Sequence, residues 1–390
     1  MPRFLVGVNY WPRRTAMYAW QRFDLGEMRE DFTRMRALGF DVVRFFLTWE
    51  AFAPHRDAID GAALRRFDAA MQALADARLL AIPTLFCGHM SGVNWLPAWT
   101  LDRNAPHGRF RTIAGGSSSP YGIGDFYADE DLVAAQLRLA RAVGERANGH
   151  AALLAWDLGN EFSNLRAPRT PLDAAAWSAA LCETLLEASG AGCTAGTHGE
   201  DVENDRAIRP SSLAARFSFA SMHGYPVYAT FSRGRTDANV VPFYDALMRA
   251  FSAKRVLFTE FGNPQCPPGA HDVGGIGCLT EDEMAAYARA ALERLVRRGA
   301  IGALWWCWAD YDPSLAGLPP FDTAPHELRF GIVRSDGSEK PVAKALSDFA
   351  REARTVTDAP QLQIAREQEY YASLPQAIFD AYDAYCRTYA

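Results

Sequence analysis

Short apolar runs, most of them rich in Val, Ile, Leu or Phe, alternate with longer amphipathic segments along most of the 390-residue chain. This alternation is typical of βα units around a parallel sheet. We expect eight strands, at residues 4–9, 41–46, 79–86, 153–158, 192–197, 216–223, 255–262 and 301–308. Helices are expected between most of them, at residues 25–38, 61–78, 129–147, 172–189, 242–253 and 280–298, with a last one after residue 340.

Eight alternating units favour a closed (β/α)8 barrel, the TIM barrel of the α/β class, over an open doubly wound sheet. The first expected strand is not followed by Gly-x-Gly-x-x-Gly, so a dinucleotide-binding domain loses its main support. We expect one barrel over residues 1–355 and a helical, tyrosine-rich extension over residues 356–390 that packs on its outside. Segment 88–128 is too long for an ordinary connection, so we expect a lid or binding loop there.

Composition argues against several classes of partner. The formal net charge is −6, without a basic block, which argues against nucleic acid or an anionic membrane as the main partner. The N-terminus enters a strand almost at once and no run of about 18 apolar residues occurs, so we expect neither a signal peptide nor a membrane span. Seven cysteines do not indicate a disulfide scaffold in a chain of this size. Cys182 is expected to pack reduced inside a helix, whereas pairing of Cys266 with Cys278 stays open. These features predict a soluble, cytoplasmic protein.

Two of the expected strands end in a glutamate. Glu161, preceded by Asn160, follows the strand at 153–158, and Glu260 lies near the end of the strand at 255–262. Carboxyl groups are rarely buried unless they are paired or functional. These two positions therefore point to a site that uses a pair of carboxylates.

In a barrel of this kind the site lies at the C-terminal ends of the strands, and nearly every strand brings polar or aromatic side chains there. These are Asn9, Tyr10, Trp11, Arg44, Trp49, Glu50, Cys87, His89, Asn160, Glu161, His198, Glu200, His223, Tyr225, Glu260, Trp305, Trp306 and Asp310. A purely structural role for the whole set would require an independent explanation at each strand end. We therefore expect most of them to converge on one pocket.

Each residue also has a structural interpretation. Glu161 could cap the following helix, Arg44 could form a structural ion pair with a carboxylate, and single histidines are more often core or rim residues than catalytic groups. Trp305 and Trp306 are adjacent on a strand and point to opposite faces, so only one can face the pocket. The segment His198-Gly199-Glu200-Asp201 has metal-ligand residue types, but barrel metal sites usually need several His or Asp ligands, and Asn and aromatic residues dominate here. We therefore expect no metal and no cofactor.

The ordered set of Arg44, Asn160-Glu161, His223-Gly224-Tyr225, Glu260 and a strand-eight tryptophan resembles the retaining β-glycosidases of clan A. The nearest type is glycoside hydrolase family five, with its cellulases, mannanases and β-mannosidases. The resemblance covers roughly residues 4–350. It implies that Glu161 is the acid/base, that Glu260 is the nucleophile and that the substrate is a carbohydrate.

The chemistry of retaining hydrolysis assigns further expected roles. It needs two carboxyl groups roughly 5–5.5 Å apart. Arg44 and Tyr225 would lower the pKa of Glu260 and orient it, whereas partial burial and the neighbouring charge would keep Glu161 protonated. The expected substrate-binding residues are Arg44, His89, Asn160 (for the sugar 2-hydroxyl), His223, Tyr225, Trp306 (with its flat face against the ring), Asn9, Trp49 and Asp310.

Long loops at the mouth favour a pocket that accepts a chain end. Loops 261–279 and 309–329, the latter with Asp310, Asp312 and Glu327, would crowd an open cleft. We therefore expect an exo-acting β-glycosidase of the β-mannosidase or β-glucosidase type. An endo-β-mannanase or cellulase is the alternative within this class, and a catalytically silent carbohydrate-binding barrel is the alternative outside it. The C-terminal extension is a candidate interface for a homo-oligomer.

Overall fold

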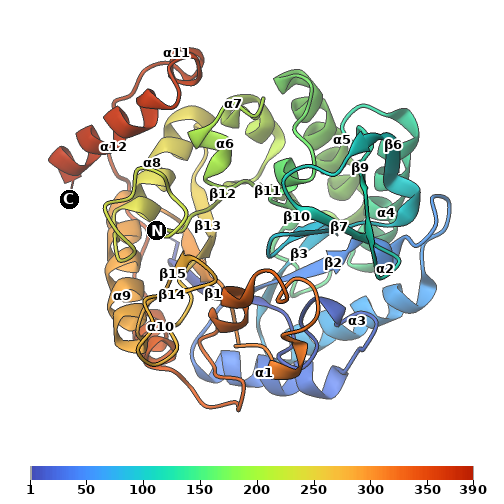
Figure 1. Cartoon of the computed structure of the whole chain (residues 1–390), viewed down its shortest axis with the longest axis horizontal. Coiled ribbons are helices and arrows are strands. Elements are labelled where there is room, and N and C mark those ends of the chain that lie inside the picture. Colours follow the sequence, from blue (N-terminus) through green and yellow to red (C-terminus); the bar gives the residue numbers. More distant parts are fainter. Residues whose placement is uncertain (1, 390) are drawn as a thin grey trace.

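The computed structural model describes residues 2–389, and its central element is a ring of eight strands with helices outside it (Figure 1). All paired neighbours in the ring run parallel. In chain order the strands are β1 (Leu5–Tyr10), β2 (Val42–Thr48), β3 (Leu80–Cys87), β10 (Trp156–Asn160), β11 (Cys193–Gly196), β12 (Ala220–His223), β13 (Val256–Phe261) and β16 (Gly302–Trp305). The expected (β/α)8 barrel is therefore confirmed.

The ring closes between β11 and β12, which the ladder of regular strand pairs leaves as its two edges. The amide of His223 donates to the carbonyl of Thr197 at 2.8 Å, and the hydroxyl of Thr197 donates to the carbonyl of Ser221 at 2.6 Å. A parallel bridge also joins His198 to His223. This seam places the residues that follow strands five and six side by side.

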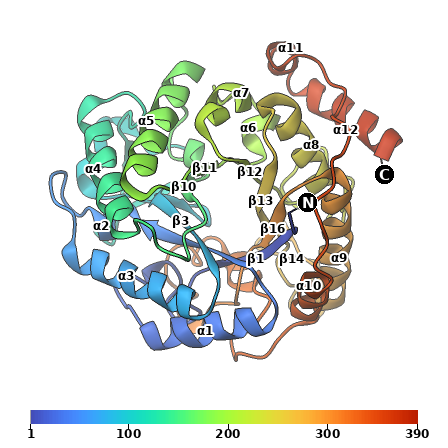
Figure 2. The same ribbon diagram turned by 180° about the vertical axis from the view of Figure 1, so that it is seen from behind.

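Amphipathic helices cover the outside of the barrel (Figure 2). The long ones are α1 (Leu25–Ala37), α3 (Gly61–Asp76), α4 (Glu130–Arg146), α5 (Pro171–Ser189), α8 (Val240–Ser252), α9 (Glu281–Arg298) and α10 (Pro341–Arg351). Asp24, Asp60 and Asp129 accept backbone N–H bonds as N-caps of α1, α3 and α4. Such caps satisfy donors that have no partner inside the helix, which explains why each helix begins where it does.

Shorter elements join these units. They are α2 (Trp49–Phe52), α6 (Glu200–Glu203), α7 (Pro210–Leu213) and the 3₁₀ turns η1 (Ala16–Tyr18), η2 (Ala98–Thr100), η3 (Phe162–Asn164), η4 (Ala214–Arg216), η5 (Pro313–Leu315) and η6 (Pro325–Arg329). The expected strand at 153–158 begins only at Trp156, and the one at 216–223 begins only at Ala220. Both overestimates arose because apolar residues continue into the turn that precedes the strand.

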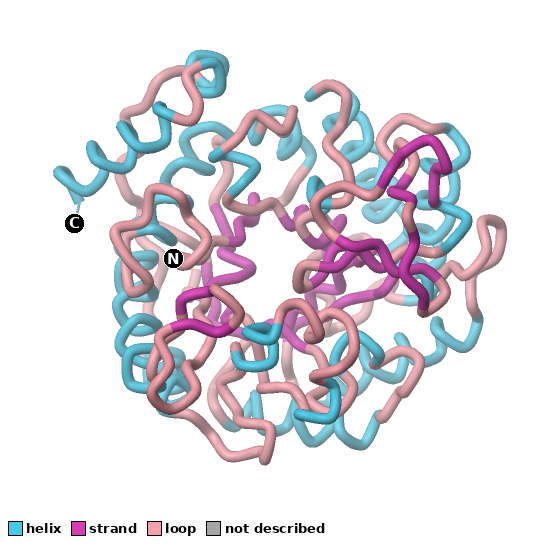
Figure 3. The backbone as a smooth tube through the Cα atoms, in the orientation of Figure 1, coloured by secondary structure: helices cyan, strands magenta, loops and turns pink. Residues whose placement is uncertain are grey.

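Segment 88–128, which was expected to be a lid or binding loop, contains regular secondary structure. The segment folds into a four-stranded sheet of β4 (His89–Met90), β5 (Val93–Trp95), β7 (Arg111–Ala114) and β8 (Ser117–Ser119), beside a pair formed by β6 (Leu101–Pro106) and β9 (Tyr121–Ile123). Loop 261–279 likewise carries the small pair β14 (Asp272–Val273) and β15 (Ile276–Gly277). Figure 3 shows these short strands beside the mouth of the barrel. Their backbone pairing gives the walls of the mouth a fixed shape.

The barrel interior is layered along its axis. A separate buried cluster of Val42, Ile82, Ala155, Phe219, Leu257 and Leu304 forms the apolar layer. Because side chains alternate along a strand, the inward residue two positions further on lies one layer nearer the C-terminal mouth. On five of these six strands that residue is polar and buried, namely Arg44, Thr84, Asp157, Ser221 and Thr259. The interior therefore changes from apolar to polar toward the C-terminal mouth, which is the end where we expect the site.

The C-terminal residues form α11 (Glu367–Ala372) and α12 (Gln376–Tyr389), which lie against the outside of the barrel (Figures 1 and 2). The hydroxyl groups of Tyr370 and Tyr371 donate to the carbonyls of Val202 and Asp201 at 2.8 and 2.9 Å. This contact ties α11 to the segment that follows β11. Within residues 2–389, no helix is both long and apolar enough to cross a bilayer.

The cysteines differ from the expectation at one position. Cys182 is bonded to Cys193, so the prediction that it packs as a reduced residue is wrong. Cys266 and Cys278, whose pairing the sequence left open, form a second disulfide. The first joins α5 to β11, and the second closes the loop after β13.

Candidate active site

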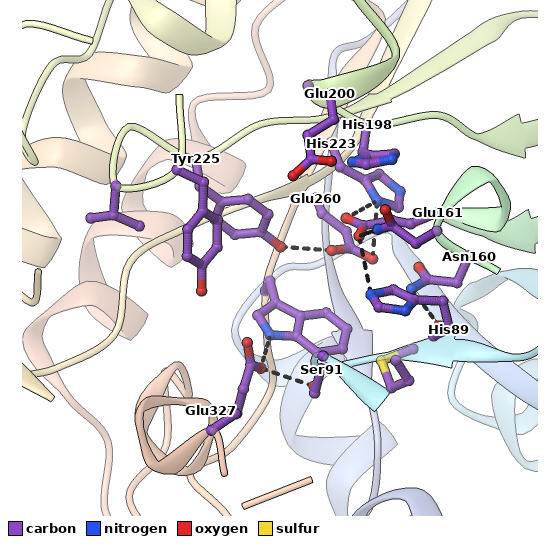
Figure 4. A pocket seen from close by; sticks show the side chains of 18 of the residues that line it. His89, Ser91, Asn160, Glu161, His198, Glu200, His223, Tyr225, Glu260 and Glu327 are labelled. Atoms are coloured by element: carbon purple, nitrogen blue, oxygen red, sulfur yellow. Dashed lines mark hydrogen bonds and ion pairs between the residues drawn. The ribbon is translucent and has the colours of Figure 1, made fainter. Parts of the chain in front are cut away.

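A cavity of about 690 Å³ opens at the C-terminal mouth of the barrel. Its floor includes residues that follow the strands, and its walls come from the segment after β3 and from the loop after β16. Seven of the eleven predicted site residues line it: His89, Asn160, Glu161, His223, Tyr225, Glu260 and Trp306 (Figure 4). Residues from several strand ends therefore converge on one cavity, as predicted.

Glu161 and Glu260 face each other across this cavity. A carboxylate oxygen of Glu161, one of Glu260 and a ring nitrogen of His223 all lie within 4.8 Å of one another. His223 Nδ1 is 3.2 Å from Glu161 Oε1 and 3.5 Å from Glu260 Oε1. This spacing fits the roughly 5–5.5 Å of retaining hydrolysis and is shorter than the roughly 6.5–9.5 Å of inverting hydrolysis.

The backbone at the end of β10 bends to present Glu161. Glu161 has a left-handed conformation, with φ of 44°, which is unfavourable for a residue with a side chain and occurs mostly where surrounding structure imposes it. Its amide donates to the carbonyl of Gly196 at 2.9 Å. A Cβ on Gly196 would lie 2.4 Å from the carbonyl oxygen of Gly159, so only glycine fits there. The close approach of β11 thus holds the bend.

Glu260 is fixed by two donors on opposite sides. Arg44 Nη1 donates to its Oε1 at 2.5 Å, and the hydroxyl of Tyr225 donates to its Oε2 at 2.6 Å. Burial raises the pKa of Tyr225 well above its ordinary value, and the charge of Glu260 raises it further. Tyr225 therefore stays protonated and keeps donating. Both oxygens of Glu260 are oriented before any ligand binds.

Arg44 lies beneath the cavity, fully buried, and connects the whole floor. Its guanidinium also donates to Asp157 from Nε at 2.8 Å, to the Oδ1 of Asn9 at 3.0 Å and to the Oδ1 of Asn160 at 2.9 Å. Burial lowers the pKa of Arg44, but the charges of Asp157 and Glu260 raise it by more. The buried cation is therefore permanently charged and matched by two carboxylates.

Four predicted substrate-binding residues do not line the cavity. Arg44 and Asn9 lie under it, and the amide nitrogen of Asn9 donates to the carbonyls of Thr259 and Trp305. Trp49 begins α2 and packs with its ring 5.2 Å from that of Phe86. Asp310 is held by Lys340 at 2.7 Å and by the amide of Gly331. Trp49 directly follows β2 as the first residue of α2, and Asp310 lies beyond the end of β16. At both places the chain has turned away from the barrel axis, so neither side chain lines the cavity where substrate contact was expected.

Two histidines lie near Glu161 in addition to His223. His89 Nδ1 is 2.8 Å from Asn94 Oδ1, and its Nε2 is 3.8 Å from Glu161 Oε2. Burial lowers the pKa of His89 to about 4, so it is neutral at neutral pH. The hydroxyl of Ser163 lies 3.0 Å from His198 Nε2, which fixes the second ring at the cavity wall.

The prediction that burial and the neighbouring charge raise the pKa of Glu161 is wrong. Burial raises this pKa, but positive charge on His198 and the hydrogen bond from His223 lower it by more, so it lies well below its ordinary value. Asn164 also donates to Glu161 Oε2 at 3.1 Å. Glu161 is therefore a carboxylate that accepts hydrogen bonds from Asn164 and His223.

Trp306 faces the cavity and Trp305 packs away from it, as predicted. Trp305 is fully buried, and its Nε1 donates to the carbonyl of Phe330 at 3.0 Å. Trp306 lines the cavity, and its Nε1 donates to Glu327 Oε2 at 3.3 Å. An aromatic ring beside two carboxyl groups suits a sugar, which has an apolar ring face and polar edges.

The sequence reasoning missed several cavity residues. Glu327 was noted only as part of a crowding loop, and Tyr228, Asn164 and Ser91 were not singled out, although all four line the cavity. Asp157, the buried partner of Arg44, was also missed. A charged residue inside an otherwise apolar strand was the available signal for Asp157, whereas the loop residues carry no strand-end signal.

Glu161, His223 and Glu260 also have the donor types of a metal site, and among residues 2–389 no other set of three comes as close. A metal held by all three would occupy the space between the two carboxyl groups. A sugar carbon needs that same space in the reaction that the spacing fits.

Comparison with known proteins supports the class of the fold and site. No protein-family model and no curated protein matches the sequence. Among solved structures, a GH5_18 enzyme from Streptomyces cattleya in complex with GlcNAc has a TM-score of 0.82 at 22% identity, over 99% of this chain and 91% of that one. An exo-beta-1,4-mannosidase from Opitutaceae bacterium strain TAV5 has a TM-score of 0.75 at 26% identity, over 94% and 60%. An endo-1,4-beta-mannanase from Rhizomucor miehei has a TM-score of 0.61 at 16% identity, over 90% and 95%.

The barrel, its paired glutamates and these structural matches support an O-glycosyl hydrolase. Within that class, the chain fits a clan A β-glycosidase of glycoside hydrolase family 5, as the resemblance implied. A retaining β-glycosidase is the activity supported at this level.

Proposed function

We propose that this protein is a retaining exo-β-glycosidase of the β-mannosidase or β-glucosidase type, with Glu260 as nucleophile and Glu161 as acid/base. The observation that carries the proposal is the separation of the two carboxylates, whose oxygens lie within 4.8 Å of each other. A sugar carbon between them could be attacked from one side while the leaving oxygen is protonated from the other.

The reaction then takes two steps. Glu260 forms a bond to the anomeric carbon as the bond to the leaving oxygen breaks, and a proton on Glu161 passes to that oxygen. Water next attacks the same carbon, gives its proton to Glu161 and releases Glu260. Because the pKa of Glu161 is low, Glu161 is a carboxylate. This is the form that takes the proton from water in the second step. The acid step requires a proton to be taken up as substrate displaces water.

Arg44 and Tyr225 serve the first step through Glu260. They hold its two oxygens at 2.5 and 2.6 Å, so the attacking oxygen is aligned before substrate arrives. Aligned, preorganised groups avoid reorganisation during the reaction. Asn160, which lines the cavity beside Glu161, is placed to meet the 2-hydroxyl.

The exo mode is supported by the walls of the cavity. Residues 89–92 and 109–111 line one side, and residues 323–330 line another. Both walls belong to long segments that crowd the mouth, and crowding favours a pocket for a chain end over an open cleft for an internal segment. An endo-acting mannanase is the alternative, and mannan oligosaccharides distinguish the two by the size of the first product.

The test is activity on a panel of aryl β-glycosides, with Glu260→Ala and Glu161→Ala as paired variants. Both are expected to lose turnover by about 10³-fold or more, and Glu161→Ala is expected to lose least on substrates with good leaving groups. Added azide should rescue the two variants with opposite product configuration, the α-azide for Glu260→Ala and the β-azide for Glu161→Ala. Unchanged rates in both variants would refute the proposal and leave a carbohydrate-binding barrel.

We also propose a division into a catalytic barrel (1–355) and a helical extension (356–390) that serves as a homo-oligomer interface. Light scattering of the full chain and of a variant of an exposed residue of α12, Phe379→Ala, tests the interface. We also propose that the protein is cytoplasmic. The two disulfides argue against this location, because disulfides persist mainly in oxidising compartments. Thiol titration of protein purified without reductant, together with cell fractionation, decides between the two.

A further inference from the structure

A third carboxyl group, that of Glu327, lies in the cavity and has no task in the two steps above. It belongs to η6, and 8% of its surface is exposed. Ser91 Oγ and Trp306 Nε1 both donate to its Oε2, at 2.9 and 3.3 Å. Its Oε1 lies 3.5 Å from His326 Nε2. One oxygen of Glu327 is thus fixed, and the other has only a distant ring nitrogen near it.

Glu327 has no cationic partner among residues 2–389. Its single ion-pair contact within 4.0 Å is with His326, and burial lowers the pKa of that histidine to about 4. Burying an ionisable group without a partner is costly. Burial, together with the charges of Glu260 and Glu161, raises the pKa of Glu327 to about 7, although the hydrogen bonds from Ser91 and Trp306 lower it. A carboxyl group kept under these conditions is best explained by a ligand that it binds.

The position of Glu327 relative to the paired glutamates indicates which part of a ligand it meets. In Figure 4 it lies on the opposite side of Glu260 from Glu161. The bond that is cleaved lies toward the acid/base, so Glu327 faces the side of the sugar remote from the leaving group. In a six-membered sugar ring, carbon 4 lies across from the anomeric carbon, with the 3-hydroxyl next to it.

We propose, on the basis of the proposed function, that Glu327 is a specificity-determining residue that binds the vicinal 3- and 4-hydroxyls of the terminal sugar. Its free oxygen accepts from both hydroxyls, since a carboxylate oxygen has two lone pairs, while Ser91 and Trp306 hold the other oxygen in place. Trp306 offers its ring face to the same sugar. A 4-hydroxyl bound to Glu327 cannot carry a further sugar, so this contact restricts the enzyme to non-reducing ends.

The test compares an aryl β-glycoside of the preferred sugar with its 2-deoxy, 3-deoxy and 4-deoxy analogues. With the wild-type protein, removal of the 3- or 4-hydroxyl is expected to lower kcat/KM by roughly 10- to 150-fold, the range for a hydrogen bond to a charged group. In Glu327→Ala the same removal should cost less than about threefold, because the partner is already gone, while the 2-deoxy penalty stays as in wild type. Glu327→Gln, which keeps an acceptor for Ser91 and Trp306, should give an intermediate 4-deoxy penalty.

Asp312→Asn is the matched control, because it makes the same change of carboxylate to amide in the same loop, outside the cavity. It should keep every wild-type ratio. If Glu327→Ala and Glu327→Gln keep the wild-type 3- and 4-deoxy penalties, the assignment of Glu327 is overturned while the glycosidase remains. If the wild-type protein hydrolyses none of the glycosides, the proposed function itself fails. Circular dichroism and melting of each variant separate loss of fold from loss of recognition.

Discussion

The floor and the rim of the cavity are built in different ways. In the floor, Arg44 is fully buried and its donors are shared among Asp157, Glu260 and two amide oxygens. At the rim, Glu327 has neutral donors on one oxygen and, among the described residues, no charged partner. The floor is a closed network around Arg44, because each nitrogen of its guanidinium has an acceptor, although Asp157 Oδ1 has no hydrogen-bond partner among residues 2–389. At the rim, by contrast, Glu327 Oε1 accepts no hydrogen bond from the described residues.

This difference follows from the elements that carry the residues. Asn9 and Arg44 are register partners on adjacent strands, and Asp157 pairs with Thr84 in the same way, so the backbone ladder fixes their relative positions. Ser91 and Glu327 come from two separate loops and meet only through their side chains. The floor is therefore fixed by the barrel backbone, whereas the rim depends on how separate loops pack against each other.

The largest effect on stability and activity should come from removing the buried cation of the floor, Arg44. Arg44→Met leaves the carboxylates of Asp157 and Glu260 buried together without their cation. We expect a loss of about 3–5 kcal/mol in the free energy of unfolding, together with loss of turnover because Glu260 is no longer held. Urea denaturation and kcat/KM on an aryl β-glycoside measure both. Stability within about 1 kcal/mol of wild type would mean that the floor is not the closed network described.

The next effect concerns the rim, and its sign is opposite. The pKa of Glu327 is raised from 4.5 to about 7, so the folded state holds a proton that the unfolded chain releases above pH 4.5. The stability from that proton is present below pH 4.5 and is lost as pH rises toward 7. Above pH 7 the cost is on the order of 3 kcal/mol, at 1.36 kcal/mol for each pKa unit.

Glu327→Gln removes this cost, so the variant should be more stable than wild type at pH 8 and about equal to it at pH 4. The other titratable groups near Glu327 (His326, Tyr228, Tyr311, Glu161 and Glu260) are the same in both proteins. Urea midpoints from pH 4 to 8 give the difference curve. A flat difference would show that Glu327 is not buried at a cost, and the contrast with the floor would disappear.

A smaller effect is expected where the wall reaches the floor. Tyr225 follows β12 and donates to Glu260 at 2.6 Å. Tyr225→Phe removes one hydrogen bond to a charged group, which is worth about 1.5–3 kcal/mol. We expect kcat to fall by roughly 10- to 150-fold, with little change in the free energy of unfolding. If KM changes and kcat does not, Tyr225 acts on the substrate and belongs functionally to the rim.

The same division separates what the sequence could predict from what it could not. Glu161, Glu260, Asn160 and His223 were found because strand ends in a barrel meet at one mouth. The αβ alternation that predicts the barrel therefore predicts their convergence too. Trp49 and Asp310 do not line the cavity, because α2 begins at Trp49 directly after β2 and because Asp310 is held by Lys340.

Other errors came from interactions that a linear pattern does not contain. Glu327 lies in η6, well beyond the end of β16, and its position depends on how two loops fold against each other. The pKa of Glu161 depends on His198, which the closure of β11 against β12 brings near. Sequence reasoning found burial, which raises this pKa, but not the competing charge.

The smallest effect is expected from removing an ion pair at the rim, between Arg109 and Glu200, and it is measured on kcat/KM. Arg109 extends from the segment after β3 and pairs with Glu200 of α6 at 2.5 Å, and the two side chains are 67% and 33% exposed. Exposed pairs contribute about 0–1 kcal/mol. Arg109→Ala should therefore change kcat/KM by less than about fivefold, with the exposed Arg103→Ala of the same segment as a control. Because screening weakens such pairs, the residual effect should vanish at about 1 M salt. A large, salt-resistant loss would instead mean that Arg109 contacts the substrate, and the rim would then supply binding groups from two walls rather than from the Glu327 side alone.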